Sequence, residues 1–267
     1  MPRPQTNQIP STPQGGAGSP QNQTTPTQQA LPPQNQPGTT PAPPAHLGPM
    51  IVIDPAHGGT DNGAQGPSGT VEKDLVLRLA RLIRTEFERQ GFRVVMTRND
   101  DSNPSYEDRA AMANAYRDAI FISVHVSSTG KVGTAHAYSY QFSSPIAASN
   151  DAGVSETPKS PVTWEEAQRP YLDVSHRLAN LLQVELSQRF PGSALISTPF
   201  AIRELRSVSA PAIGVELSSI SVPDANMLAA MGVPLASALI RSVQMLRPGN
   251  SLSRNGSSVK AQVAGAN

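Results

Sequence analysis

Short apolar runs alternate with amphipathic stretches in the first half of the folded part of the chain. The run MIVID at 50–54 is followed by Pro55 and a glycine pair, which predicts a buried strand leading into a loop. Over 73–90 the apolar residues fall on one helical face, and Gly91 marks the helix end. These apolar positions are Leu75, Leu79, Leu82, Ile83 and Phe87.

The same alternation continues with a strand over 92–97, a helix over 106–116 and a second apolar strand over 119–126. The order strand, helix, strand, helix, strand predicts a parallel sheet whose right-handed crossovers place helices on both faces. Ligands should then gather at the carboxyl ends of the strands.

The second half of the chain predicts four further elements. They are an alternating strand over 134–140, a helix over 171–190, a buried strand over 212–217 and a last helix through Leu228 to Leu246. Residues 143–170 have no clear periodicity and are expected to form a long surface insertion. We therefore expect one α/β domain over 49–248 with a mostly parallel, twisted sheet.

The two ends of the chain differ from this domain in composition. Residues 1–48 hold twelve of the 26 prolines and nine glutamines, with Arg3 as their one charged residue. Such a segment buries too little apolar surface to offset its ordering entropy, so we expect a disordered Pro/Gln-rich linker. Residues 249–267 predict a second disordered tail in the same way.

Charge and cysteine content narrow the function. The tails carry Arg3, Arg254 and Lys260 but no acidic residue, which leaves 18 basic and 20 acidic residues and a net charge of about −2 in the domain. A near-neutral domain without a basic stripe argues against nucleic acid as the main partner. Because cysteine is absent, disulfides and thiolate metal sites are excluded, and any metal must bind His, Asp or Glu.

The sequence predicts neither a membrane span nor a secretory signal. No apolar run reaches the roughly 18 residues of a transmembrane helix, and the N-terminus lacks the charged and apolar regions of a signal peptide. We expect either a cytoplasmic protein or a true start upstream of Met1.

Three candidate metal ligands come from separate places that share one edge of the predicted sheet. His57 follows the first strand, Glu72 begins the first helix and His125 lies near the end of the third strand. Two imidazoles and one carboxylate are the ligand set of many catalytic zinc sites, in which a fourth position stays open. Taken singly, each residue has a structural alternative: a packed histidine, or a helix-start glutamate favoured by the helix dipole.

Glu216 lies inside the apolar run AIGVEL, where a charged side chain is unfavourable unless it has a partner or a task. It is a candidate general base and acid, or the partner of an arginine such as Arg206. Asp54 and Asp61 either orient His57 or serve the turn.

Two further histidines are expected to be structural. His136 lies on an alternating strand and His176 on a helix flank, and both are outside these motifs.

Together these motifs resemble the zinc-dependent N-acetylmuramoyl-L-alanine amidases over roughly residues 50–246. The similar segments are IVIDPAHGGTDNGAQG with Glu72-Lys73, Thr97-Arg98, Arg109 with Ala113-Asn114, Ser123-Val124-His125, and Pro211-Ala212 through Val215-Glu216. The resemblance implies one Zn²⁺ ion on His57, Glu72 and His125, with Glu216 as general base and acid. It also implies a peptidoglycan substrate, a periplasmic or extracellular location and possible activation by a protein partner.

The sequence differs from the usual family pattern after two of these motifs. Val126-Ser127 follow His125, and Ser218-Ser219 come shortly after Glu216. Two alternatives to the amidase therefore stay open: a zinc peptidase or deacetylase on the same architecture, or a peptidoglycan-binding module that has lost catalysis.

Overall fold

The computed structural model describes residues 48–67, 69–142, 163–221 and 225–246. The predicted disordered linker, apart from its last residue, lies outside the described residues. So do the predicted C-terminal tail and residues 143–162 of the predicted insertion.

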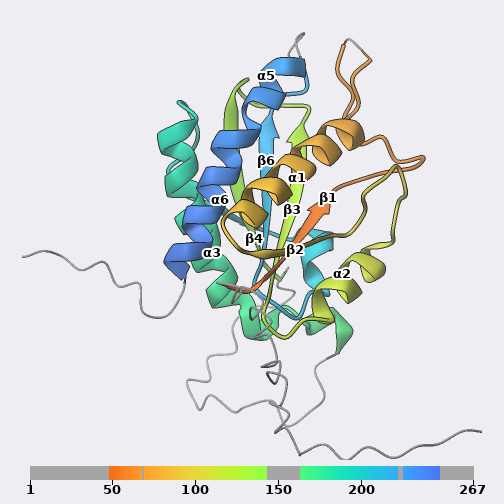
Figure 1. Ribbon diagram of the computed structural model, residues 1–267, viewed down its shortest axis with the longest axis vertical. Coiled ribbons are helices and arrows are strands. Elements are labelled where there is room, and N and C mark those ends of the chain that lie inside the picture. The colour runs from red at the N-terminus through yellow and green to blue at the C-terminus, as the bar shows by residue number, and fades with distance from the viewer. Residues whose placement is uncertain (1–47, 68, 143–162, 222–224, 247–267) are drawn as a thin grey trace, which may run out of the picture. The chain divides into compact units, whose positions relative to one another are not determined.

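A six-stranded sheet forms the centre of the domain, in the order β2-β1-β3-β6-β4-β5 (Figure 1). The strands are β1 (Met50–Pro55), β2 (Arg93–Met96), β3 (Ala119–Ser127), β4 (Thr134–Tyr140), β5 (Thr198–Phe200) and β6 (Ala212–Ser218). All neighbouring strands are parallel except β4, which runs antiparallel to β6. The predicted mostly parallel sheet is confirmed.

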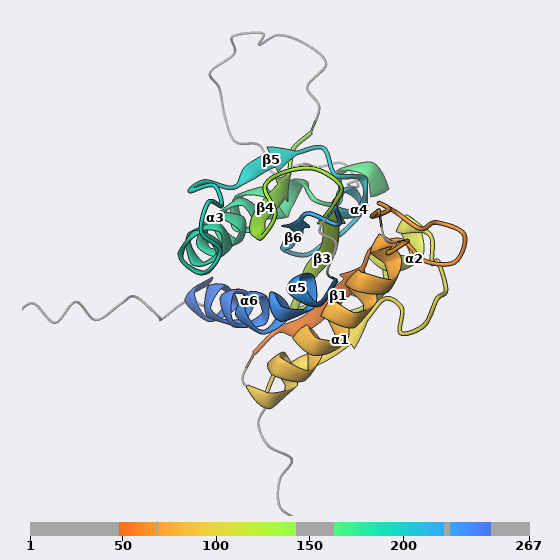
Figure 2. The same cartoon turned by 90° about the horizontal axis from the view of Figure 1, so that it is seen from above.

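Helices cover both faces of this sheet, as predicted (Figure 2). One face packs against α1 (Glu72–Arg89), α3 (Leu172–Arg189), α5 (Ala225–Ala230) and α6 (Gly232–Leu246). The other face packs against α2 (Tyr106–Asn114) and α4 (Arg203–Arg206). Two 3-10 turns, Trp164–Glu166 and Arg169–Tyr171, precede α3.

The alternation of side chains along the strands produces two separate apolar cores. In β1, Ile51 and Ile53 face the larger core under α1, whereas Val52 faces the smaller core with Phe121 of β3. Since successive strand residues point to opposite faces, continuous apolar runs such as IVI and AIFISV suit a sheet that is buried on both sides.

The C-terminal helix differs from the prediction. It is interrupted at Met231, so that α5 and α6 are separate helices. A Cβ on Gly232 would lie 3.1 Å from a Leu82 methyl carbon, which shows how closely α6 approaches α1. The stretch Asn226–Leu246 is long and apolar enough to cross a membrane, but 56% of its most apolar 18-residue window is buried in the domain. We interpret α5 and α6 as core helices of the domain.

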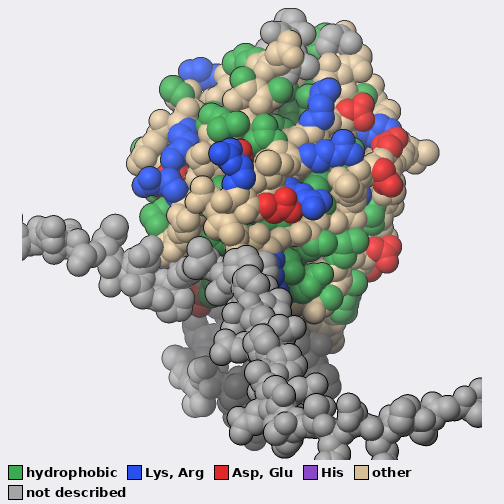
Figure 3. Space-filling view, viewed as in Figure 1, with side chains coloured by type: hydrophobic (Ala, Val, Ile, Leu, Met, Phe, Trp, Pro, Cys, Tyr) green, Lys and Arg blue, Asp and Glu red, His purple; other side chains and the backbone are tan. Residues whose placement is uncertain are grey.

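Charged side chains are intermixed on the face of the molecule in Figure 3. Basic side chains are spread across this face, most acidic side chains lie towards its right-hand side, and apolar side chains lie between them. This face carries no continuous basic stripe.

The sheet places the predicted ligands at one edge. β1 and β3 are parallel neighbours, with Asp54 opposite Ser123 and Pro55 opposite Val124. Their carboxyl ends therefore lie side by side, and the loop after β1 leads back to the first turn of α1. His57, Glu72 and His125 all come from this edge.

Candidate active site

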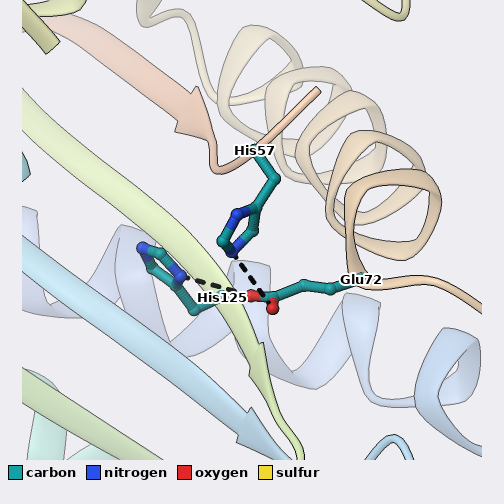
Figure 4. A group of neighbouring side chains, drawn as sticks. All are labelled: His57, Glu72 and His125. Carbon is teal, nitrogen blue, oxygen red and sulfur yellow. Dashed lines mark hydrogen bonds and ion pairs between the residues drawn. The ribbon is translucent and has the colours of Figure 1, made fainter. Parts of the chain in front are cut away.

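The three predicted ligands converge on one point (Figure 4). His57 Nε2 lies 3.1 Å from Glu72 Oε2, and His125 Nδ1 lies 3.2 Å from Glu72 Oε1. Two atoms bound to a tetrahedral zinc ion at about 2.0–2.1 Å would be about 3.3 Å apart. The donor set suits one metal ion with three protein ligands, because one candidate ligand atom from each residue lies within 4.8 Å of the others. Within the described part of the chain, no other cluster of His, Asp and Glu has this spacing.

Glu72 is buried and held on both carboxylate oxygens. Oε2 accepts a hydrogen bond from the Ala64 amide at 2.8 Å, and Oε1 accepts one from the Val126 amide at 2.9 Å. Burial opposes ionisation, but His125, His57 and the Ala64 amide together lower the pKa of Glu72 far below its usual range. Glu72 is the first residue of α1, as predicted, and its carboxylate reaches the backbone of β3. The carboxylate is ionised at neutral pH and is held in place by these hydrogen bonds.

His57 has a backbone conformation that is rare for a side-chain-bearing residue. Its φ of 62° makes it the one non-glycine residue with positive φ in the described ranges. Such a conformation persists only where the surroundings enforce it. The next residue, Gly58, has a φ of 132°, and a Cβ there would lie 2.1 Å from the Ser102 carbonyl oxygen.

Two buried arginines enforce this loop conformation by donating to its carbonyl groups. Arg98 donates to Pro55 O at 2.9 Å and Ala56 O at 2.8 Å. Arg109 donates to Pro55 O at 3.0 Å and His57 O at 2.9 Å.

Asp54 pairs with Arg109 rather than with His57. Its Oδ1 lies 2.6 Å from Arg109 Nη1 and accepts from Thr97, while its Oδ2 accepts from Ser123 Oγ at 2.9 Å. The Ser123 hydroxyl also lies 3.3 Å from His125 Nε2. Asp54 therefore contacts neither histidine directly. It is linked to the His57 backbone by Arg109 and to the His125 ring by Ser123.

A carboxylate lies behind each candidate histidine ligand. Asp61 has both of the expected roles: its Oδ2 is 2.8 Å from His57 Nδ1, and its Oδ1 accepts from the Gly63 amide in the turn at 3.0 Å. Glu204 Oε1 is 3.6 Å from His125 Nε2. The sequence analysis did not identify Glu204, because α4 is too short for a periodic signal. The one available cue is its position in a charged cluster shortly before the strand that carries Glu216.

Glu216 lies beside His125, since these residues are direct partners in the register of β3 and β6. Its Oε1 is 3.5 Å from Tyr138 Oη. Burial raises the pKa of Glu216, opposed by His125 and by a hydrogen bond with Ser127. Arg206, the alternative partner, pairs with Glu165 at 2.8 Å instead.

The remaining candidate histidines lie outside the metal-ligating group. His136 Nε2 is 2.7 Å from Thr198 Oγ1, and His176 Nδ1 is 3.2 Å from Ser139 Oγ. These contacts agree with the predicted structural roles.

Two cavities are each lined by one of the candidate histidine ligands. The first, of about 450 Å³, is lined by His125, Glu216, Tyr138, Phe200 and Ile202, among others. The second, of about 300 Å³, is lined by His57, Asp61, Asn103, Tyr106 and Arg203, among others. His125 lines only the first cavity and His57 only the second, whereas Glu204 lines both.

Residues 51–232 match the family model described as N-acetylmuramoyl-L-alanine amidase. The chain belongs to this family. A 95-residue segment is 41% identical to the N-acetylmuramoyl-L-alanine amidase AmiC of Escherichia coli O6:H1, covering 31% of this chain and 23% of that protein. The chain thus matches less than a quarter of this curated relative's length.

Solved amidase structures share the fold of this chain. The amidase Ami1 from Mycobacterium smegmatis superposes with a TM-score of 0.57 at 19% identity, covering 75% of this chain and 97% of that one. The CwlD amidase from Clostridioides difficile, in complex with the GerS lipoprotein, gives a TM-score of 0.55 at 18% identity, covering 74% and 99%. The predicted family and fold are confirmed.

Replacing Arg109 by Met should destabilise the protein, because Asp54 would be left buried without its cation. We expect the free energy of unfolding to fall by about 3–5 kcal/mol in urea denaturation. The matched control is Arg89→Met, whose side chain is 70% exposed, and which should change stability by less than about 0.5 kcal/mol. Equal stabilities of the two variants would contradict the proposed importance of the ion pair.

Replacing Gly63 by Ala should weaken metal binding. The added methyl carbon would lie 2.6 Å from Glu72 Oε2 and 2.8 Å from His57 Nε2, so ligand atoms must move. Gly69→Ala is the control, since Gly69 also has a positive φ but has open space around its Cβ position. We expect Zn²⁺ affinity, measured by calorimetry, to fall at least about tenfold for Gly63→Ala relative to Gly69→Ala. Equal affinities would mean that Gly63 does not shape the site.

Metal binding should release protons at neutral pH. Burial lowers the pKa of His57, but Glu72 and Asp61 outweigh this and raise it to about 9 without metal. His57 must lose its proton before Nε2 can ligate, so Zn²⁺ affinity should rise as the pH increases from 7 towards 9. Titration calorimetry at pH 7 in buffers of different ionisation enthalpy measures the released protons. Zero release would show that His57 is neutral before the metal binds.

Proposed function

We propose that this chain is a zinc-dependent amidase that hydrolyses the bond between N-acetylmuramic acid and L-alanine in peptidoglycan. The observation that carries the proposal is the group His57, Glu72 and His125, with Glu216 beside it, in a member of this family. Nitrogen and oxygen donors in a three-residue set suit zinc with an open coordination position.

Zinc in this position would polarise the scissile carbonyl and lower the pKa of water towards about 7. The two histidines and Glu72 would hold the ion, and Asp61 fixes the His57 ring by accepting from Nδ1. The buried ion pair between Asp54 and Arg109 holds the loop that carries His57.

Glu216 is the proposed general base and acid. Its raised pKa makes it a better proton acceptor than an exposed glutamate. In our proposal its carboxylate takes a proton from the attacking water and passes it to the leaving amine of L-alanine. Contacts with Tyr138 and Ser127 hold the carboxylate beside His125. Ser127 thus contributes to this site although it departs from the usual family sequence.

The substrate defines where such an enzyme would act. Peptidoglycan lies outside the cytoplasmic membrane, so the proposal includes a periplasmic or extracellular location. It also includes an activating protein partner, because the related CwlD amidase is in complex with a lipoprotein.

Replacing Glu216 by Gln should abolish most activity while the metal stays bound. We expect kcat on purified peptidoglycan to fall by about 10²–10⁴-fold, since the proton acceptor is lost. The matched control is Glu88→Gln on the exposed surface of α1, which should retain full activity. Mass spectrometry of the products and zinc content by elemental analysis are the measurements.

Several outcomes would contradict this proposal. Undiminished activity of Glu216→Gln would exclude Glu216 as the base. Release of acetate, or of peptide fragments cut within the stem, would favour a deacetylase or peptidase. Zinc and wall binding by the unmodified protein without turnover would favour a binding module.

A further inference from the structure

The two cavities offer different chemistry to the two arms of the proposed substrate. This inference rests on the proposed function, because an amide bond held at the ligand group divides the substrate into a sugar arm and a peptide arm. The arms leave the carbonyl carbon in opposite directions, and the two cavities have different linings that share Glu204. The lining of each cavity indicates which arm it accepts.

The cavity beside His125 suits a neutral, partly apolar group. Tyr138, Phe200 and Ile202 form its apolar lining, and its charged residues other than histidine are Glu204 and Glu216. No Lys or Arg lines it among the described residues. The Phe200 side chain is 61% exposed and so is open for contact. Sugar rings are uncharged and pack their C–H faces on aromatic rings, whereas a carboxylate would find no Lys or Arg to pair with in this lining.

The cavity beside His57 is lined by the acidic residues Asp54, Asp61, Glu107 and Glu204, but unlike the first cavity it also contains arginine. Arg203 lies at the start of α4, and its guanidinium carbon is 4.8 Å from the ring centre of Tyr106 on α2. This contact holds the guanidinium over a residue that lines the same cavity. The other arginine in the lining, Arg109, is already paired with Asp54.

The Arg203 side chain is exposed and has no carboxylate partner among the ion pairs of the described residues, whereas its neighbour Arg206 pairs with Glu165. An exposed guanidinium restrained by an aromatic ring presents a planar set of donors that matches a carboxylate. In the stem peptide, the first free carboxylate after the scissile bond belongs to the second residue, D-glutamate. Two extended residues span only about 7 Å, so this group stays close to the reaction centre.

We propose that Arg203 binds the α-carboxylate of the second stem residue. The stem peptide then lies in the cavity of His57 and Tyr106, and the muramic acid lies in the cavity of His125 and Phe200. Arg203 is thus a specificity-determining residue: it distinguishes stems with free D-glutamate from stems in which this carboxyl group is amidated.

The test compares two synthetic muramoyl tripeptides that differ only at the second residue, with an α-carboxylate in one and an α-carboxamide in the other. The zinc-loaded protein should cleave the carboxylate form with about tenfold higher kcat/KM, mainly through a lower KM, because a charge-assisted hydrogen bond is lost in the amide. Arg203→Gln should remove this preference by raising KM for the carboxylate form alone. Arg203→Lys, which keeps the charge, should restore part of it.

Two control variants show whether the preference depends on Arg203 itself or on the charge of α4 and the binding of substrate in general. Arg206→Gln removes the same charge from the same helix and should keep the preference. Phe200→Ser changes the proposed sugar side and should raise KM for both substrates equally. A preference that survives Arg203→Gln, or cleavage of both substrates at equal rates by the unmodified protein, would overturn the role of Arg203 alone. Cleavage of neither substrate would contradict the proposed function and this assignment with it.

Discussion

The buried ion pair between Asp54 and Arg109 is the interaction on which the site depends. Asp54 lies near the carboxyl end of β1, and Arg109 reaches it from α2. The same guanidinium donates to the backbone of His57, while Asp54 accepts from Ser123 on β3. A single fully desolvated pair thereby links two strands, a helix and both candidate histidine ligands. Burying these charges is unfavourable unless each is fully satisfied, and here both are.

The positive φ of His57 follows from this arrangement. A left-handed conformation costs of order 1–3 kcal/mol, and the hydrogen bonds from Arg98 and Arg109 to its loop offset that cost. In return, the loop turns back sharply enough for the imidazole to meet Glu72 at the start of α1. The strained backbone is therefore at His57 itself, the residue whose side chain must point towards Glu72.

The site also concentrates negative charge. Glu72, Asp61, Glu204 and Glu216 surround two imidazoles in a partly buried region. Like charges at such short range disfavour ionisation unless cations are nearby, and the histidines respond by holding their protons more tightly. A divalent cation bound to His57, Glu72 and His125 would supply the missing positive charge and displace those protons.

Much of this molecule could be predicted from its sequence. Apolar runs such as MIVID and AIFISV predicted the buried strands, and the positions of His57, Glu72 and His125 predicted their convergence, since carboxyl ends of parallel strands share an edge. The sequence predicted neither Glu204 nor β5, because α4 and β5 are only four and three residues long and too short to show a hydrophobic periodicity. The sequence also did not identify Arg109 as the partner of Asp54, because the two residues are far apart in the chain and meet only when α2 packs on the sheet.

The most direct test of the account is a zinc titration of metal-stripped protein acting on purified peptidoglycan. The account predicts no release of intact stem peptides without metal. Release should then rise in proportion to added Zn²⁺ and reach a plateau at about one equivalent, because three protein ligands hold a single ion. Full activity of the stripped protein, or a plateau only at two or more equivalents, would contradict a single catalytic zinc ion at His57, Glu72 and His125.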